Sequence, residues 1–156
     1  MGLDMYLNAK RYVSKYSNEG DEARARAIQE QFPELAGRTG HWGDESPIKQ
    51  VEIEAGYWRK ANAIHDWFVK NVQGGTDDCS PYYVERARLE ELRDICKRVL
   101  AFRHLAVDLL PTTKGFFFGS TDYGDWYFDD LQQTVAIIDD ALTLPESWEF
   151  EYRASW

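Results

Sequence analysis

The fold class is indicated by residues 3–13, LDMYLNAKRYV, where apolar and polar side chains alternate. Every second side chain from Leu3 to Leu7 is apolar, and the residues between them are polar or amphipathic. This period of two is typical of a strand with one buried face. The alternation recurs at residues 48–56 and 148–153, so the sequence predicts three strands.

Between the strands, apolar residues recur at helical spacing and predict about four helices. These cover residues 19–32, 58–72, 85–102 and 126–142. Strands that are apolar on one side only favour an antiparallel sheet. We therefore expect an α+β fold, a small and mainly antiparallel sheet packed against the helices. No internal repeat or low-complexity tract divides the chain, which predicts one globular domain over residues 1–156.

The composition is that of a folded domain. The chain has 156 residues, of which 44% are hydrophobic and 15% aromatic, enough to bury a core. No apolar run approaches the roughly 18 residues of a membrane span, and we expect no membrane contact. Residues 1–4 show no export signal, and two cysteines are too few for a disulfide framework. These features predict a cytoplasmic protein.

The net charge of −9 is concentrated near the C-terminus. Residues 122–156 hold nine of the acidic residues and a single base, Arg153. The chain has no net excess of basic residues, which predicts no direct contact with nucleic acid. Six aspartates in this region could bind a basic host protein, or they could form a solvated surface. They are Asp122, Asp125, Asp129, Asp130, Asp139 and Asp140.

Motifs for metals, cofactors and catalysis are not found in the sequence. The three histidines and two cysteines show neither CxxC nor HxxxH spacing. The chain also has no phosphate loop of the Walker type, no GxGxxG and no nucleophile elbow. We therefore predict no metal and no cofactor, and the sequence assigns no catalytic residue.

The most informative segment is residues 56–68, GYWRKANAIHDWF, at a predicted strand-to-helix junction. Helix N-termini bind anions through free backbone N–H groups, and two bases lie in the expected first turn. A cation there is unfavourable unless an anion offsets it. The candidate ligand-binding residues are Tyr57, Trp58, Arg59, Lys60, Asn62 and His65.

These residues also have structural interpretations. His65 falls on or beside the apolar stripe of the predicted helix, where a histidine with satisfied hydrogen bonds can belong to the core. Tyr57, Trp58 and Trp67 can be ordinary core aromatics rather than faces on which a base stacks.

A second segment, residues 110–123, reads LPTTKGFFFGSTDY. The GFFFG run predicts a turn into a short, buried strand or loop. Hydroxyl groups and one lysine bracket this run and could donate to phosphate oxygens. The candidates are Thr112, Thr113, Lys114, Ser120 and Thr121. Alternatively the segment is a tight hairpin in which Ser120 or Thr121 caps the next helix.

Several blocks of the chain form one pattern: MGLDMYL at residues 1–7, YWRKANAIHDWFV at 57–69, the pair Asp78-Cys79, LLPT at 109–112, GFFFGST at 115–121 and YRASW at 152–156. Together these blocks resemble a family of small proteins from bacteriophages and prophages. The resemblance spans nearly the whole chain. It implies a phage or prophage origin, an accessory role and a place in the host bacterial cytosol, and it implies no particular chemistry.

Three functions follow as hypotheses. The first is a non-catalytic counter-defence protein that sequesters a nucleotide-like anionic small molecule in a pocket formed by the two segments. The second is an acidic inhibitor of a nucleic-acid-handling host complex, comparable to some anti-CRISPR proteins. The third is a small nucleotide-processing enzyme that uses His65 with Asp77 or Asp78. A symmetric homodimer is expected only because such symmetry is common.

Overall fold

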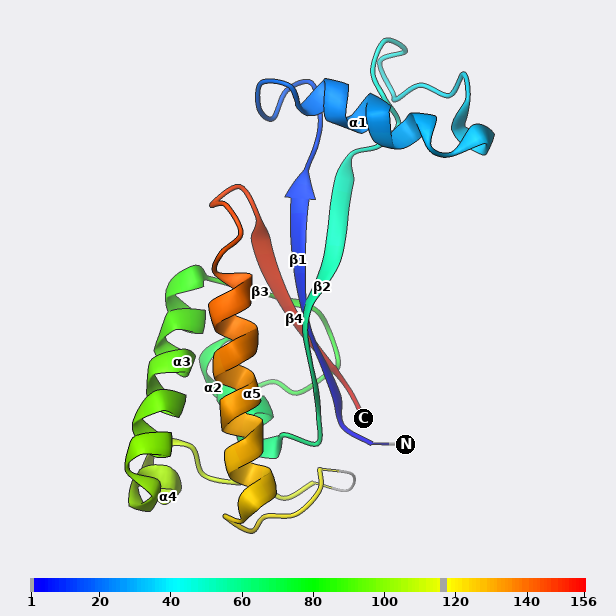
Figure 1. Cartoon of the computed structure of the whole chain (residues 1–156). Coiled ribbons are helices and arrows are strands. Elements are labelled where there is room, and N and C mark those ends of the chain that lie inside the picture. Colours follow the sequence, from blue (N-terminus) through cyan, green and yellow to red (C-terminus); the bar gives the residue numbers. More distant parts are fainter. Residues whose placement is uncertain (1, 116–117) are drawn as a thin grey trace. The chain divides into compact units, whose positions relative to one another are not determined.

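A computed structural model describes residues 2–115 and 118–156 of the chain (Figure 1). In chain order the elements are β1 (Asp4–Tyr12), α1 (Asp21–Glu30), β2 (Gln50–Arg59), α2 (Asn62–Asn71), β3 (Tyr82–Val84), α3 (Arg86–Ala101), α4 (Ala106–Leu109), α5 (Asp125–Ala141) and β4 (Glu149–Ser155). Short 3-10 turns lie at Pro33–Leu35 and Arg103–Leu105. The strands form an antiparallel sheet in the order β2-β1-β4-β3, which confirms the predicted α+β fold.

The chain divides into two compact units. Unit 1 consists of residues 1–9 and 54–156, and unit 2 of residues 10–53. The boundaries fall within β1 and β2, so both strands run from one unit into the other. A single domain over the whole chain stays a prediction.

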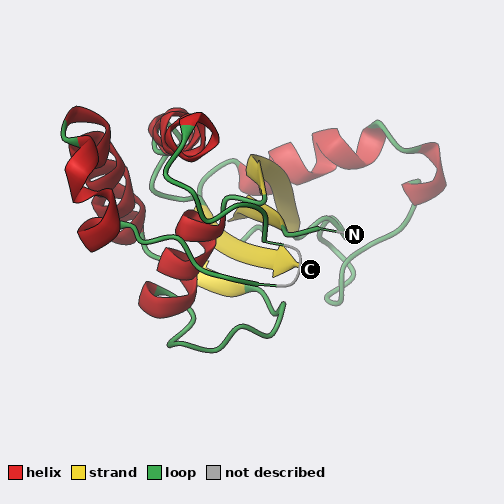
Figure 2. Cartoon of the chain, turned by 90° about the horizontal axis from the view of Figure 1, so that it is seen from below, coloured by secondary structure: helices red, strands yellow, loops and turns green. Residues whose placement is uncertain are grey.

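In unit 1 the core lies between the sheet and the helices α2, α3 and α5, which cover one of its faces (Figures 1 and 2). β1 supplies every second residue to this core, as its alternation predicted. The helices contribute stripes at helical spacing, and α3 packs along α5. The fully buried members include Leu3, Met5, Leu7, Ile64, Phe68, Leu89, Leu92, Leu131 and Ile138. Burying one such large side chain contributes about 1.5–3 kcal/mol.

Unit 2 has a polar interior around α1. The carboxylate of Asp21 is fully buried and accepts hydrogen bonds from Arg11 and Arg24 at 2.8 and 2.7 Å. A hydrogen bond from Asn18 and further bonds from neighbouring donors lower the pKa of Asp21. A buried charge needs such partners, because its desolvation is otherwise unfavourable.

One boundary differs from the prediction in a way that affects the site. The second strand was expected to end at residue 56 and the next helix to begin at 58. Instead β2 runs to Arg59 and α2 begins at Asn62, because Tyr57 and Trp58 continue the sheet. Aromatic residues favour strands. Trp58 therefore lies in the core beside Gly56, whereas Ile53 of the same strand is exposed.

The prediction of three strands was also incomplete. β3 is a fourth strand of three residues, between the second and third predicted helices, and Tyr82 lies opposite Tyr152 of β4. A strand this short shows too little alternation to be recognised, and it forms because its partner strand is present. The other predicted strands and helices agree with the structure to within two residues at each end.

Phe116 and Phe117 of the expected turn lie outside the described residues. Among the helices that are described, none combines the length and the apolar composition needed to cross a membrane.

Candidate functional site

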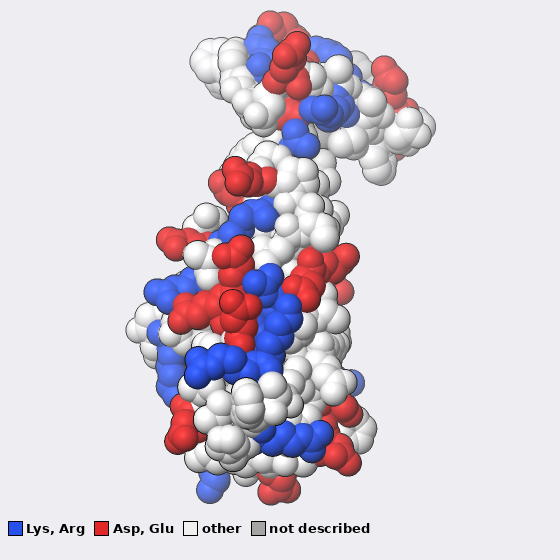
Figure 3. All heavy atoms as spheres, turned by 60° about the vertical axis from the view of Figure 1, so that its left-hand side comes forward, with Lys and Arg blue, Asp and Glu red and all other residues white. Residues whose placement is uncertain are grey.

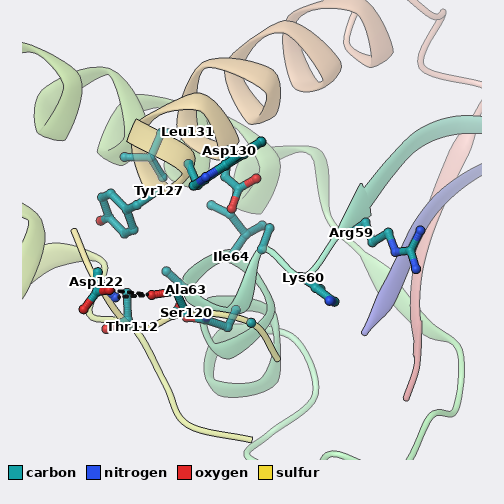
Figure 4. A pocket seen from close by; sticks show the side chains of 14 residues that line it. Arg59, Lys60, Ala63, Ile64, Thr112, Ser120, Asp122, Tyr127, Asp130 and Leu131 are labelled. Carbon is teal, nitrogen blue, oxygen red and sulfur yellow. Dashed lines mark hydrogen bonds between the residues drawn. The ribbon is translucent and has the colours of Figure 1, made fainter. Parts of the chain in front are cut away.

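A cavity of about 490 Å³ lies in unit 1 between the start of α2, the start of α5 and the loop of residues 112–122 (Figure 4). We call it the α2–α5 cavity. Its lining residues are Arg59, Lys60, Ala61, Asn62, Ala63, Ile64, Thr112, Gly119, Ser120, Asp122, Trp126, Tyr127, Asp130 and Leu131. Small-molecule sites have volumes of roughly 300–1,000 Å³, so the cavity is large enough for such a ligand.

Asn62 builds one wall of this cavity. Its side-chain nitrogen donates to the carbonyl oxygens of Phe118 and Ser120 at 3.1 and 2.8 Å. Its side-chain oxygen accepts a hydrogen bond from the backbone N–H of Thr113 at 3.1 Å. Both donor hydrogens and one acceptor site of the amide are therefore used by the loop. Asn62 was predicted to contact a ligand, but these bonds make it a residue that positions the loop.

Lys60 occupies an unusual backbone conformation next to the cavity. Its φ angle is 61°, in the left-handed region that disfavours residues with a side chain. The turn is held by a hydrogen bond from its N–H to the carbonyl oxygen of Leu3 at 2.8 Å. Gly119 packs against it so closely that a Cβ there would lie 3.2 Å from the Cβ of Lys60. Such strain costs about 1–3 kcal/mol and is concentrated at functional sites.

The charges of the cavity are separated along its length. In Figure 4 Lys60 and Arg59 lie on the side away from Tyr127 and Thr112, and the Arg59 side chain points away from the other labelled side chains. The Arg59 side chain is largely exposed, and its Nε lies 3.9 Å from a carboxylate oxygen of Asp4. Cations therefore lie at the outer end, where an anionic group can bind without full loss of hydration.

The opposite wall carries an unpaired acid. The side chain of Asp130 extends from α5 toward Ile64 of α2 (Figure 4). Within residues 2–115 and 118–156, its carboxylate takes part in no hydrogen bond or ion pair. Burial, together with the neighbouring Asp129 carboxylate, raises the pKa of Asp130 to about 6. A carboxyl group with a perturbed pKa in a cavity is typical of a functional site.

Trp126 is a cavity residue that the sequence reasoning missed. It lies in the first turn of α5 and is 84% exposed although it lines the cavity. A signal was present, because this tryptophan falls off the apolar stripe through Leu131 and Ile138. A large aromatic ring outside the buried stripe has a face available for a ligand.

Three of the predicted ligand residues line neither this cavity nor the second one described below. Trp58 is fully buried, and its indole N–H donates to Thr134 Oγ1 at 2.9 Å, so it has no ring face to offer. The hydroxyl of Tyr57 donates to Asp4. The carbonyl oxygen of Thr121 accepts from Thr112 Oγ1 at 2.9 Å.

The proposed capping role of the loop hydroxyls is wrong. The N-cap of α5 is Gly124, and no side chain caps it. Ser120 Oγ instead donates to the carboxylate of Asp122 at 2.9 Å and accepts from its backbone N–H at 3.0 Å. This short-range pair shapes the loop at the cavity wall.

A second cavity of about 370 Å³, the His65 cavity, contains the remaining candidates His65, Thr113 and Lys114. His65 is 1% exposed, and both of its ring nitrogens are bonded. Nδ1 lies 2.8 Å from the hydroxyl of Tyr152, and Nε2 lies 3.0 Å from a carboxylate oxygen of Asp77. The other oxygen of Asp77 accepts from Trp156 Nε1 at 3.0 Å. These contacts agree with the interpretation of His65 as a core histidine with satisfied hydrogen bonds.

The six aspartates considered for a basic partner have different surroundings. Asp139 lies 3.4 Å from Arg93 and 3.3 Å from Lys97, and two others, Asp122 and Asp130, line the α2–α5 cavity. On the face of unit 1 seen from the side of α3, acidic and basic side chains are interspersed (Figure 3). Mixed charge of this kind reduces the attraction for a basic channel.

The residues with metal-binding or nucleophilic side chains are dispersed. In the part of the chain that the structure describes, no group of three or more His, Cys, Asp and Glu is placed to hold a metal ion. Cys96 is buried, which raises the pKa of its thiol to about 12, and Cys79 is a free thiol on the link before β3. A thiol with a raised pKa is a poor nucleophile.

Comparisons of the chain with models of protein families, with curated proteins and with solved structures give no match. The residues of the α2–α5 cavity are therefore the basis for a functional proposal.

Proposed function

We propose that this protein is a non-catalytic binder that holds a nucleotide-like anionic small molecule in the α2–α5 cavity. The observation that carries the proposal is the arrangement of three features around one cavity. Cations lie at one end, an exposed tryptophan lies on the wall, and an unpaired carboxyl faces the interior.

The anionic group of the ligand has two sources of attraction at the outer end. Arg59 and Lys60 supply positive charge, and the residues Ala61–Ile64 at the start of α2 line the same cavity. The N–H groups of a helix's first turn and the dipole of the helix favour an anion at this position. A phosphate group fits both contributions, because it accepts several charged hydrogen bonds at once.

The aromatic part of the ligand is matched by Trp126. A planar ring that stacks on an exposed indole gains about 1–3 kcal/mol in related base–aromatic contacts. Ile64 and Leu131 supply apolar surface beside it. A base and a phosphate joined by a sugar combine these two kinds of group in one molecule.

Sequestration requires the ligand to bind but not to react. The charged, aromatic and apolar groups of the α2–α5 cavity supply contacts for such binding. The resemblance of the chain to small phage proteins supports a counter-defence role, in which the protein removes a nucleotide signal from the host cytosol. We also propose that the protein is a symmetric homodimer, because such symmetry is common among oligomers.

The test is thermal unfolding of the purified protein with a panel of mono-, di- and cyclic nucleotides, followed by analysis of the recovered ligand. A ligand at a hundred times its Kd raises the free energy of unfolding by about 2.7 kcal/mol. For a chain of this size that shifts Tm by several degrees. We expect such a shift with the nucleotide recovered intact; a changed nucleotide would instead indicate an enzyme.

Three variants locate the site. Trp126→Ala is expected to abolish the shift with little effect on the unliganded protein, because the side chain is exposed. Lys60→Gly is expected to weaken binding and yet raise the stability of the unliganded protein, since glycine relieves the φ angle of 61°. Lys114→Gln is the control: it removes a lysine charge from the His65 cavity instead, and it is expected to leave nucleotide binding unchanged. The proposal would be contradicted if no nucleotide shifts Tm, or if the shift is lost in Lys114→Gln and kept in the other two variants.

A further inference from the structure

We propose that the α2–α5 cavity selects guanine among the nucleobases, and that Asp130 makes this selection. The inference rests on the proposed nucleotide binding and specifies which nucleotide the cavity takes.

Two residues of α5, Trp126 and Asp130, are spaced so that both face the cavity. Trp126 and Asp130 are four residues apart, so they project from the same side of the helix. Both line the cavity, one with an exposed ring and the other with a carboxyl directed toward α2. A base that stacks on Trp126 therefore presents one of its edges to the carboxyl of Asp130.

The carboxyl of Asp130 is available to a ligand. Among the described residues nothing donates a hydrogen bond to it, although a half-buried carboxylate is more stable with donors. Arg59 and Lys60 lie at the outer edge of the cavity, away from Asp130, where they can hold the phosphate. When a nucleotide is held in this way, its base is the part that reaches Asp130 and can donate to it.

The nucleobases differ in the hydrogen-bond donors and acceptors on their pairing edges. An ionised carboxylate only accepts, and its two oxygens can take two adjacent donors. Guanine presents two adjacent donors, N1–H and the N2 amino group, on its pairing edge. Adenine and cytosine present an amino donor beside a ring-nitrogen acceptor, so one carboxylate oxygen would face a lone pair. Uracil and thymine place one donor between two carbonyl oxygens.

The experiment compares three nucleoside monophosphates, of guanosine, inosine and adenosine, by titration calorimetry at about pH 8, where Asp130 is ionised. Inosine monophosphate is guanosine monophosphate without the N2 amino group. Loss of one hydrogen bond to a charged group weakens binding by about tenfold or more. We expect guanosine monophosphate to bind at least about tenfold more tightly than the inosine form, and adenosine monophosphate to bind most weakly.

Asp130→Asn tests the residue itself. Asparagine places one donor group, NH2, beside one acceptor oxygen, the pattern that matches the amino group and ring nitrogen of adenine. The variant is expected to lose about tenfold or more in affinity for guanosine monophosphate and to prefer adenosine monophosphate. Asp129→Asn is the matched control, because it removes the same charge from the exposed neighbour on the same helix and leaves the cavity unchanged. It is expected to keep the guanine preference.

The outcomes separate the two proposals. If no nucleotide binds, the proposed function fails and the selection fails with it. If all three bind equally, or if adenosine monophosphate binds most tightly to the unmodified protein, binding stands and the selection of guanine is overturned. Equal loss of all three nucleotides in Asp130→Asn would also overturn it, since base reading requires a change in preference.

Discussion

The side-chain nitrogen of Asn62 lies 2.8 Å from the carbonyl oxygen of Ser120, which joins the first turn of α2 to the loop before α5. The same amide also bonds Phe118 and Thr113, so one side chain holds both described stretches of this loop, residues 112–115 and 118–122. The described residues of this loop line both the α2–α5 cavity and the His65 cavity, with Ser120 on the wall of the first and Thr113 on the wall of the second. Their shapes therefore depend on the same three hydrogen bonds.

Asn62→Ala is expected to lower the free energy of unfolding by about 2–3 kcal/mol, because three hydrogen bonds of a buried side chain are lost. It should also remove nucleotide binding, since the cavity wall is released. Urea unfolding and the nucleotide titration measure the two effects. Asn71→Ala is the control on the same helix: its amide makes one bond, to the carbonyl of Trp67, and the expected cost is about 1 kcal/mol or less. Equal costs for the two variants would contradict this role of Asn62.

Gly56 is expected to tolerate no larger residue. A Cβ at this position would lie 2.3 Å from Cγ2 of Ile137, where β2 passes under α5. Gly56→Ala should therefore lower the free energy of unfolding by about 1–3 kcal/mol. The double variant with Ile137→Ala removes the clashing methyl group, and its loss should be clearly smaller than the sum of the two single losses. Additive losses in a double-mutant cycle would rule out this contact as the cause.

The stability of the protein is expected to depend on pH through Asp130. Its pKa is raised from 3.8 to about 6, so between these values the folded state binds more protons than the unfolded state. The free energy of unfolding should therefore fall as the pH rises from about 4 to about 7, and then level off. Because the group is partly exposed and screened by solvent, we expect a change of about 1–2 kcal/mol.

Asp130→Asn separates this effect from other titrations. The variant should match the unmodified protein near pH 4 and be more stable near pH 7.5, whereas Asp129→Asn should retain most of the pH dependence. Chemical unfolding at several pH values measures the difference. An unchanged profile in Asp130→Asn would assign the dependence to other groups.

His65 is expected to be structural. Tyr152→Phe removes the hydroxyl that faces Nδ1 and leaves this buried nitrogen without its partner, at a cost of about 1–3 kcal/mol. Tyr82→Phe is a close control, because Tyr82 lies opposite Tyr152 in the sheet and its hydroxyl bonds Asp78 in an exposed position. We expect that change to cost less than about 0.5 kcal/mol. The comparison requires only urea unfolding, and a larger loss for Tyr82→Phe would contradict it.

Some of the candidate site could be predicted from the sequence. A strand-to-helix junction rich in cations and a loop rich in hydroxyls were both expected to form a pocket, and Arg59, Lys60, Thr112 and Ser120 do line one cavity. The sequence did not show that the Trp58 ring is buried or that the Asn62 amide bonds the loop, for a common reason. Whether an aromatic ring or an amide faces a ligand depends on what packs against it, and those partners are distant in sequence.

By itself the sequence determined the fold class and most of the elements. Alternation in β1 and β4 and apolar stripes in α3 and α5 are properties of neighbouring residues, so they are visible before folding. Tertiary structure decided where β2 ends, that Tyr82–Val84 form a strand, and which residues surround the α2–α5 cavity. Each of these depends on a partner far along the chain, such as β4 beside β3 or Asp130 facing α2. Local periodicity carries no information about which distant segments come together, and here those contacts create the candidate site.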